Sequence, residues 1–391
     1  MISVAEALDH LFALVDPLPS EQVALRSAHG RVLAADVVAL RDQPPFAASA
    51  MDGYAISRAD ALPGAKLRII GEAAAGHAFA GAVTPGEAVR IFTGAPMPTG
   101  TDWVVIQEDV VATGDEITLN ETLEQSAYVR AAGADFTAGS RITAPRLISP
   151  ADTALMAAMN AATIHVTRKP VVAIIATGDE LVQPGETPRA DQIIASNSYG
   201  IAALVENFGA TARLLPIAKD NAPSLELALD LASDADLIVT IGGASVGDHD
   251  IVGEVAQSQG LDRAFYKIAM RPGKPLMAGR LGQAAMIGLP GNPVSAMVCA
   301  HIFLGPVIHY MLGLGAHPAP THTAQLTNPL GANGPREHYM RARVTGHHVT
   351  VFERQDSALL SVLADANCLA VRPPHDPARK IGDEIKIIHL N

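Results

Sequence analysis

The chain has 391 residues, of which 49% are hydrophobic and 17% are charged. This length exceeds what a single hydrophobic core usually supports, so we expect two to four domains. The apolar content excludes a disordered chain. The formal net charge of −12 excludes nucleic acid as the main partner, because nucleic acid requires a basic face.

Cysteine usage and hydropathy exclude two further classes of protein. Cys299 and Cys368 are far apart and lie in apolar surroundings, so neither a disulfide framework nor a cysteine metal site is supported. The N-terminus lacks a basic stretch followed by an apolar one, and no run approaches the length of a membrane span. We therefore expect a cytoplasmic protein without a membrane partner.

The N-terminal segment predicts one helix followed by a long β-rich region. Ser3 and Glu6 form a capping box, the apolar residues from Leu8 to Val15 fall on one helical face, and Pro17 ends the helix. From Gln22 to Thr167, glycine and proline separate short β-like runs, without the periodicity of a Rossmann domain. The clearest runs are 66–70, 88–92, 103–107 and 116–119.

A different pattern begins at Pro170. The run 171–175 is continuously apolar, as in strands that are buried on both faces, and 237–241 and 285–289 repeat it. Ser196 begins a helix whose apolar face ends near Phe208. Strands that alternate with amphipathic helices predict a parallel sheet with its ligand at the carboxyl ends of the strands. After Gly315 the β-like runs 339–344, 348–353 and 385–389 predict a small C-terminal β domain.

Three glycine-containing loops in the 237–295 segment carry the strongest functional signal. The first contains Gly242, Gly243, Ser245, Asp248 and Asp250, the second is Arg271-Pro272-Gly273-Lys274-Pro275, and the third runs from Gly288 through Pro290 and Pro293 to Ser295. Glycine exposes backbone N–H groups to a ligand, while the two cations attract phosphate oxygens. The aspartates favour a divalent cation. Together the loops predict a phosphorylated ligand that is held with Mg²⁺, although each loop alone is compatible with an ordinary tight turn.

Other acidic residues follow predicted strands. Glu180 comes after the strand 171–175, although a solvated Glu180 and a turn-capping Asp179 are equally compatible with the pattern. Asp220 follows the apolar run 214–218, at the end of an expected strand or as the N-cap of a helix that begins near Pro223.

In the β-rich region, Asp52 and Thr93 stand beside turn glycines. Asp135 lies close to Arg130, where a salt bridge within a turn is the more ordinary interpretation. His249 is interpreted as a loop residue. The sequence contains no nucleophile elbow, no His-Glu-x-x-His helix and no Walker A loop.

Seven short motifs follow one another along the chain. They are Met-Asp-Gly-Tyr-Ala at 51–55, Thr-Gly-Ala-Pro-Met-Pro at 93–98, Thr-Gly-Asp-Glu-Leu at 177–181, Ser-Asn-Ser-Tyr at 196–199, Gly-Gly-Ala-Ser-Val-Gly at 242–247, Arg-Pro-Gly-Lys-Pro at 271–275 and Gly-Leu-Pro-Gly-Asn-Pro-Val-Ser at 288–295. Taken in order, they resemble the molybdopterin molybdenumtransferase family, whose members catalyse the last step of molybdenum cofactor assembly and are related to the C-terminal domain of gephyrin. The likeness runs from near Ser3 to about Ile387.

The resemblance implies a fold of the α/β class with additional β-rich subdomains. The subunit would be elongated and multi-domain, with a three-layer α/β molybdopterin-binding domain and a small C-terminal β domain. The implied divisions are 1–20, a helix packing with the α/β domain; 21–45 with 138–169, an elongated linker subdomain; 46–137, a β-rich subdomain; 170–317, the α/β domain; and 318–391, the C-terminal β domain.

The resemblance also implies an activity, which is the Mg²⁺-dependent insertion of molybdate into adenylylated molybdopterin with release of AMP. The implied catalytic residues are Asp52, Thr93, Glu180, Asp220 and Asp250, and the last three would be the metal ligands. The implied substrate-binding residues are Asp135, Gly242, Gly243, Ser245, Lys267, Arg271, Lys274, Pro290, Pro293 and Arg341.

The implied partners are a second copy of the chain, the adenylyltransferase that makes the substrate, and apo-molybdoenzymes or their chaperones. In the homodimer, the 170–317 domain of one subunit and the 46–137 domain of the other would share an active site. Two alternatives remain open. One is the molybdopterin adenylyltransferase itself, typically a single short α/β domain, and the other is a pterin-binding scaffold like gephyrin. The sequence does not distinguish molybdate from tungstate, because both are tetrahedral dianions of similar size.

Overall fold

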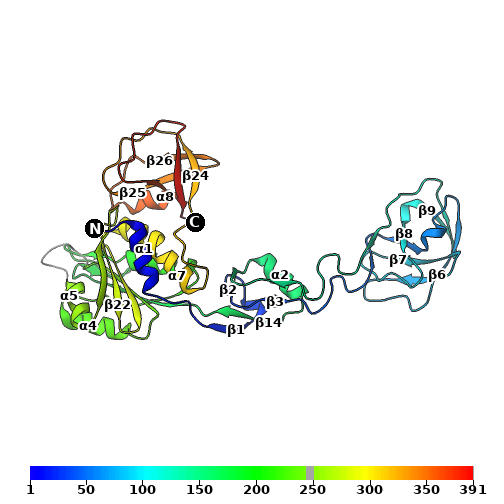
Figure 1. Ribbon diagram of the computed structural model, residues 1–391, viewed down its shortest axis with the longest axis horizontal. Helices are drawn as coiled ribbons and strands as arrows, with labels where there is room; N and C mark the ends of the chain where they lie inside the picture. The colour runs from blue at the N-terminus through cyan, green and yellow to red at the C-terminus, as the bar shows by residue number, and fades with distance from the viewer. Residues whose placement is uncertain (244–250, 391) are drawn as a thin grey trace.

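The computed structural model describes residues 1–243 and 251–390 of the chain. The molecule is elongated (Figure 1). An α/β unit with the C-terminal β unit stacked on it occupies one end, a β-rich unit occupies the other, and a narrow linker connects them. This architecture confirms the predicted fold class.

The α/β unit is built on a six-stranded sheet in the order β18-β15-β19-β23-β22-β20. The first four strands are parallel, as the sequence predicts. The predicted parallel sheet does not continue to the other edge, where β22 is antiparallel to both β23 and β20. Only Gly282 and Gln283 connect β22 to β23, and a connection this short forces an antiparallel pair. The strands are β15 (Val171–Ala176), β18 (Thr211–Leu214), β19 (Leu237–Ile241), β20 (Asp262–Lys267), β22 (Pro275–Leu281) and β23 (Ala284–Leu289).

Helices cover both faces of this sheet. Helices α1, α3, α6 and α7 contribute to the larger apolar cluster, while α4 and α5 contribute to the cluster on the other face. The capping box predicted at Ser3 and Glu6 is present at the start of α1. The helices are α1 (Val4–Ala13), α3 (Asn197–Asn207), α4 (Ala222–Leu231), α5 (Ile251–Ser258), α6 (Pro293–Cys299), the π-helical turn η4 (Ala300–Leu304) and α7 (Gly305–Met311).

The last three of these segments form one continuous helix, Pro293–Met311, of 19 residues. It is long and apolar enough to cross a membrane, so the expectation that no run approaches this length is wrong. However, 78% of its most apolar window is buried inside the fold. The helix is apolar because it packs against the sheet on one side and other helices around it.

The linker and the β-rich unit are made of short strands. The linker contains the sheet β1-β14-β2-β13, the pair β3 and β12, and helix α2, which enclose one apolar cluster. The β-rich unit is a six-stranded sheet, β8-β5-β7-β6-β10-β9, with an apolar cluster on each face. The linker elements are β1 (Ser20–Ala24), β2 (Val32–Leu33), β3 (Val37–Val38), β12 (Arg141–Ile142), β13 (Arg146–Leu147), α2 (Pro150–Ala158) and β14 (Thr163–Thr167). Those of the β-rich unit are β4 (Ala48–Ser49), β5 (Gly53–Ile56), β6 (Lys66–Ala73), β7 (Glu87–Ile91), β8 (Trp103–Ile106), β9 (Val110–Thr113), β10 (Glu116–Leu119) and β11 (Val129–Arg130).

The C-terminal unit is a small closed sheet, because β27 pairs with both β28 and β25. Strand β21 of the α/β segment adds to it in parallel, which places Arg271 opposite His338 and ties the two units together. The elements are β21 (Met270–Arg271), β24 (His322–Leu326), β25 (Glu337–Thr345), β26 (His348–Val351), α8 (Leu360–Asp365), β27 (Cys368–Arg372) and β28 (Glu384–His389).

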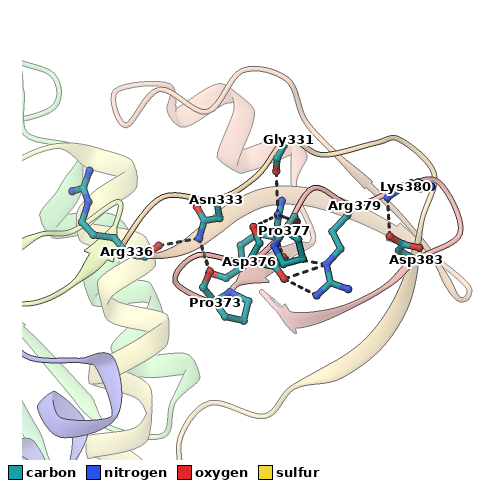
Figure 2. Close-up of polar contacts among 10 residues, drawn as sticks. Gly331, Asn333, Arg336, Pro373, Asp376, Pro377, Arg379, Lys380 and Asp383 are labelled. Atoms are coloured by element: carbon teal, nitrogen blue, oxygen red, sulfur yellow. Dashed lines mark hydrogen bonds and ion pairs between the residues drawn. The ribbon is translucent and has the colours of Figure 1, made fainter.

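A buried ion-pair network holds the loops at one end of this unit (Figure 2). The Asp376 carboxylate accepts hydrogen bonds from both Arg372 and Arg379, and these lower its pKa against the opposing effect of burial. The Arg372 guanidinium also donates to the carbonyls of Gly331 and Pro377. Because Arg372 and Asp376 are only 2% and 6% exposed, neither charge could remain there without its partner.

Candidate active site

The largest concentration of predicted site residues lines a cavity of about 620 Å³ at the carboxyl edge of the α/β sheet. The loops after β15, β19 and β23 form its walls together with the N-termini of α3 and α6. It includes six of the predicted residues, namely Glu180, Asp220, Gly242, Gly243, Pro290 and Pro293. Open α/β sheets bind ligands at this edge because the strand ends leave a crevice there.

The two glycines after β19 are required by the backbone. Gly242 and Gly243 have φ values of +95° and +63°, in the region that disfavours other residues. A Cβ atom at Gly243 would lie 2.2 Å from Cγ2 of Val252, and one at Gly242 would lie 2.8 Å from the carbonyl oxygen of Thr177. The chain therefore turns closely against the loop after β15. Ser245, Asp248, His249 and Asp250 lie outside the described residues.

Three carboxylates gather on one side of the cavity. Partial loss of hydration and the negative charges of Asp179 and Glu180 raise the pKa of Asp220. The Asp220 backbone N–H donates to Asp179 Oδ1 at 3.3 Å. Asp179, which the sequence suggests only as a turn cap, thus both holds the Asp220 loop and adds to the negative charge.

The local structure around Asp220 differs from both sequence-based interpretations. Strand β18 ends at Leu214, so Asp220 does not end a strand, although a single bridge between Thr177 and Ala218 keeps this segment beside β15. The N-cap of α4 is Asn221, whose side chain accepts the Ser224 N–H. Asp220 therefore remains available to a ligand.

The carboxylates at the cavity are not held in ion pairs with other described residues. Asp179, Glu180 and Asp220 form no ion pair within residues 1–243 and 251–390. In the same part of the chain, no three His, Cys, Asp or Glu side chains are placed to hold a metal ion. Two of the three predicted metal ligands, Glu180 and Asp220, line one cavity, and the third, Asp250, lies outside the described residues.

The start of α3 offers backbone N–H groups to the cavity, whereas α6 begins with Pro293, which has no N–H, and its Val294 N–H donates to the Ser357 carbonyl. Ser196 and Asn292, at the N-caps of α3 and α6, make no side-chain capping hydrogen bond. Asn197 instead donates to the carbonyl of Gly291 at 2.7 Å and fixes the two loops together. Uncapped helix N-termini that face a cavity favour anionic ligands. Asn197 belongs to the Ser196–Tyr199 motif but is not among the predicted site residues. The pair of polar residues at the start of a helix was the signal that could have identified it.

The predicted cations lie next to this cavity. Pairing of β20 with β22 sets Lys267 opposite Pro275, which lines the cavity, and Lys274 precedes it. Lys267, Arg271 and Lys274 form no ion pair with any described residue. Gly273, with φ of +103°, allows this loop to pack on the helix beneath, since its Cβ would lie 2.4 Å from Sγ of Cys299.

Arg341 reaches the same region from the C-terminal unit. Its side chain is fully buried; Nη2 donates to the carbonyls of Asp356 and Arg354, whereas Nε and Nη1 are buried without a partner. Burial lowers the pKa of its guanidinium. The segment that holds Arg341 also lies against the cavity: the Ser357 carbonyl accepts the Val294 N–H, and Ala358 lines the cavity.

The remaining predicted residues lie at the far end of the molecule, in and beside the β-rich unit (Figure 1). Asp52 Oδ1 accepts both the N–H and the hydroxyl of Thr93, each at 2.8 Å, and these hydrogen bonds lower the Asp52 pKa. Asp135 lines a separate cavity of about 570 Å³ together with Gly94 and Arg130. One chain therefore does not bring these three residues to the α/β cavity.

Comparison with known proteins identifies the family. Residues 2–160 match the MoeA N-terminal region (domain I and II), residues 173–310 match the probable molybdopterin binding domain, and residues 323–390 match the MoeA C-terminal region (domain IV). The chain belongs to the molybdopterin molybdenumtransferase (MoeA) family. This confirms the resemblance seen in the sequence and the prediction that the protein is an enzyme of the transferase class.

Individual relatives are similar to this chain over almost its whole length. The molybdopterin molybdenumtransferase of Nostoc sp. is 34% identical, covering 100% of this chain and 94% of its own, and that of Haemophilus influenzae is 33% identical, covering 96% and 95%. The crystal structure of the molybdopterin biosynthesis MoeA protein from Pyrococcus horikoshii OT3 superposes with a TM-score of 0.86 at 26% identity, with full coverage of both chains.

Proposed function

We propose that this enzyme inserts molybdate into adenylylated molybdopterin in a Mg²⁺-dependent reaction that releases AMP. The observation that carries the proposal is that two kinds of group meet at the α/β cavity. Glu180 and Asp220, which form no ion pair with a described residue, line it together with the uncapped start of α3, and the cations Lys267 and Lys274 adjoin it. A phosphorylated ligand bound with a divalent cation satisfies both kinds of group at once.

The donor set fits magnesium. Glu180 and Asp220, completed by Asp250, would supply the carboxylate oxygens that Mg²⁺ prefers. Burial, and then the charges of Asp179 and Glu180, raise the pKa of Asp220, and a bound cation would oppose both effects. The ion would polarise the phosphoanhydride between AMP and molybdopterin. Arg271 and Lys274 would neutralise the phosphate oxygens from the adjacent loop.

Arg341 is fully buried outside the cavity lining, and we propose it as the group that binds a tetrahedral oxyanion because two of its nitrogens lack a partner. A guanidinium with two buried, unpartnered nitrogens is costly, and an oxyanion that reached Nε and Nη1 would satisfy both. The family resemblance assigns Lys267 or Arg341 to molybdate or to the pterin phosphate. In this chain the two unpartnered nitrogens of Arg341 favour its binding to molybdate, which leaves Lys267 for the pterin phosphate.

A second copy of the chain would complete the site. Asp52, Thr93 and Asp135 are implied by the family but lie far from Glu180 within one chain, so we propose a homodimer in which each β-rich unit reaches the partner's cavity. Mixed Asp52→Ala and Glu180→Ala subunits should then regain part of the activity, because one site per heterodimer keeps both residues. An absence of rescue in verified heterodimers would refute a shared site.

Reconstitution tests the activity directly. A cofactor-free molybdoenzyme is mixed with the purified protein, Mg²⁺, adenylylated molybdopterin and either molybdate or tungstate. The proposal predicts AMP release coupled to activation of the molybdoenzyme. It would be refuted if neither molybdate nor tungstate gave AMP release. An adenylyltransferase would instead consume ATP and release pyrophosphate, and a scaffold would do neither. The product with each oxyanion identifies the preferred one.

The same chemistry suggests the protein's neighbours in the cell. Adenylylated molybdopterin is made by an adenylyltransferase, and the finished cofactor passes to apo-molybdoenzymes or their chaperones. We therefore propose contacts with these proteins in the cytoplasm. Co-purification of each pair, with and without substrate, tests the contacts.

A further inference from the structure

A second cavity, of about 610 Å³, lies between the α/β unit and the C-terminal unit. Its walls come from the end of α3, the η4–α7 helix, the segment that joins the two units, and the ends of β24 and β28. It shares no lining residue with the proposed active site. The proposed function leaves this cavity without a role.

The chemistry of its lining is unusual. Five imidazole side chains line it, together with Phe208, one amide and aliphatic or glycine and proline residues. None of the described lining residues is an Asp, Glu, Lys or Arg. The histidines are His301, His309, His317, His322 and His389.

The inner part of the cavity is shaped around Phe208. Its ring centroid lies 5.9 Å from those of both His301 and His309, with the rings almost perpendicular. Gly305 makes room for it, because a Cβ there would lie 3.1 Å from the Phe208 ring. His301 belongs to the π-helical turn η4, an energetically unfavourable geometry that recurs at functional sites.

The imidazole nitrogens are free to interact with a ligand. Within residues 1–243 and 251–390, none of the five rings makes a hydrogen bond, and the only ring contacts are with Phe208 or between His322 and His389. Burial lowers the pKa of His301 to about 4 and also lowers that of His309. Both rings are therefore neutral at pH 7, and each offers one N–H donor and one nitrogen acceptor.

We propose that this cavity binds an uncharged, flat heteroaromatic molecule of about two fused rings. The volume is typical of small-molecule sites, and the aromatic and aliphatic walls suit the faces of such a ligand. The imidazoles and Asn207 suit heteroatoms at its edge. A charged ligand would be buried without a counter-charge on the described walls, and no three described side chains are placed to chelate a metal.

Binding of indazole to the full-length protein tests this inference, with indene as the control of equal shape that lacks ring nitrogens. Calorimetry gives the affinity, and ¹⁵N shifts of the imidazoles locate the site. Indazole should bind at least about tenfold more tightly than indene and shift His301 and His309, since the two ligands differ only in polar contacts. Equal affinities, or shifts elsewhere only, would overturn the proposal.

Variants separate this site from the active site. His309→Leu keeps much of the volume and removes both ring nitrogens, so it should weaken indazole about tenfold while indene is unaffected. His317→Ala removes an imidazole at the exposed rim of the cavity, where the substitution should not affect folding, and it should also weaken indazole binding. Lys274→Ala, in the proposed active site, should leave indazole affinity unchanged. Retention of affinity in both histidine variants, or its loss in Lys274→Ala, would refute the assignment, whatever the outcome of the AMP-release assay.

Discussion

Replacement of Lys274 by alanine tests how the active site holds phosphate. Lys274 is half-buried beside the cavity and forms no ion pair with a described residue, so its charge is available to a ligand. Pro272 and Pro275 restrict the backbone on either side, and the Lys274 carbonyl accepts the Ile268 N–H at 3.1 Å. The loop is therefore formed before ligand binds, and alanine would remove the charge without disturbing the backbone.

The magnitude follows from the type of contact. A hydrogen bond to a charged group contributes about 1.5–3 kcal/mol, which corresponds to roughly tenfold to hundredfold in affinity for adenylylated molybdopterin. Stability should change by no more than about 0.5 kcal/mol, because the side chain makes no hydrogen bond or ion pair with a described residue. Calorimetric titration gives the affinity, and urea unfolding gives the stability.

Lys169→Ala is the matched control. Lys169 is exposed, forms no ion pair within the described residues, and precedes β15 at the amino end of the strands. It should leave both measurements unchanged. If Lys274→Ala keeps wild-type affinity, or if it unfolds the protein, Lys274 is structural and the phosphate site lies elsewhere.

Three further changes test other parts of the molecule. Thr93→Val removes one of the two hydrogen bonds that lower the Asp52 pKa, so NMR titration should show a higher Asp52 pKa than in the wild type. The stability that the ionised Asp52 contributes is lost as the pH falls through its pKa, so in the variant this loss should occur at a higher pH. An unchanged pKa would contradict the assignment. Asp376→Asn leaves the buried Arg372 without a counter-charge and should cost about 3–5 kcal/mol in urea unfolding; a loss below about 1 kcal/mol would show that solvent reaches the network. Glu180→Gln keeps shape but removes a proposed metal ligand, so AMP release at limiting Mg²⁺ should fall steeply while the melting temperature is unchanged, and near wild-type turnover would exclude that role.

The sequence predicts the central strands well because each is buried on both faces. Such strands read as continuous apolar runs, and both Val171–Ala176 and Leu237–Ile241 stand out between polar or glycine-rich segments. Strand direction at the edge of the sheet is less evident. It depends on the two-residue connection at Gly282, which resembles any other polar break between apolar runs.

Only the part of the candidate active site that lies at the ends of the strands can be predicted from the sequence. Glycine loops after buried strands indicate one crevice, and the structure brings Glu180, Asp220 and Gly242 together there. The contribution of Asp179 depends on which backbone N–H it reaches, which no spacing shows. The burial of Arg341 depends on how the segment 354–358 wraps around it, and the five imidazoles of the second cavity are spread over almost ninety residues without a shared motif.

The distance between the two ends of the chain constrains how any shared site can form. Five residue pairs join β1 to β14, and the linker has its own apolar cluster, so it behaves as a stiff spacer. Side-chain rearrangement therefore cannot bring Asp52 to Glu180. Near the β-rich end, Leu40, Phe46 and Met51 are 75%, 41% and 40% exposed, which is unfavourable for large apolar side chains in water. A second copy of the chain could cover these apolar side chains and also place Asp52 at its partner's cavity. Bending of a single chain would leave the apolar side chains exposed.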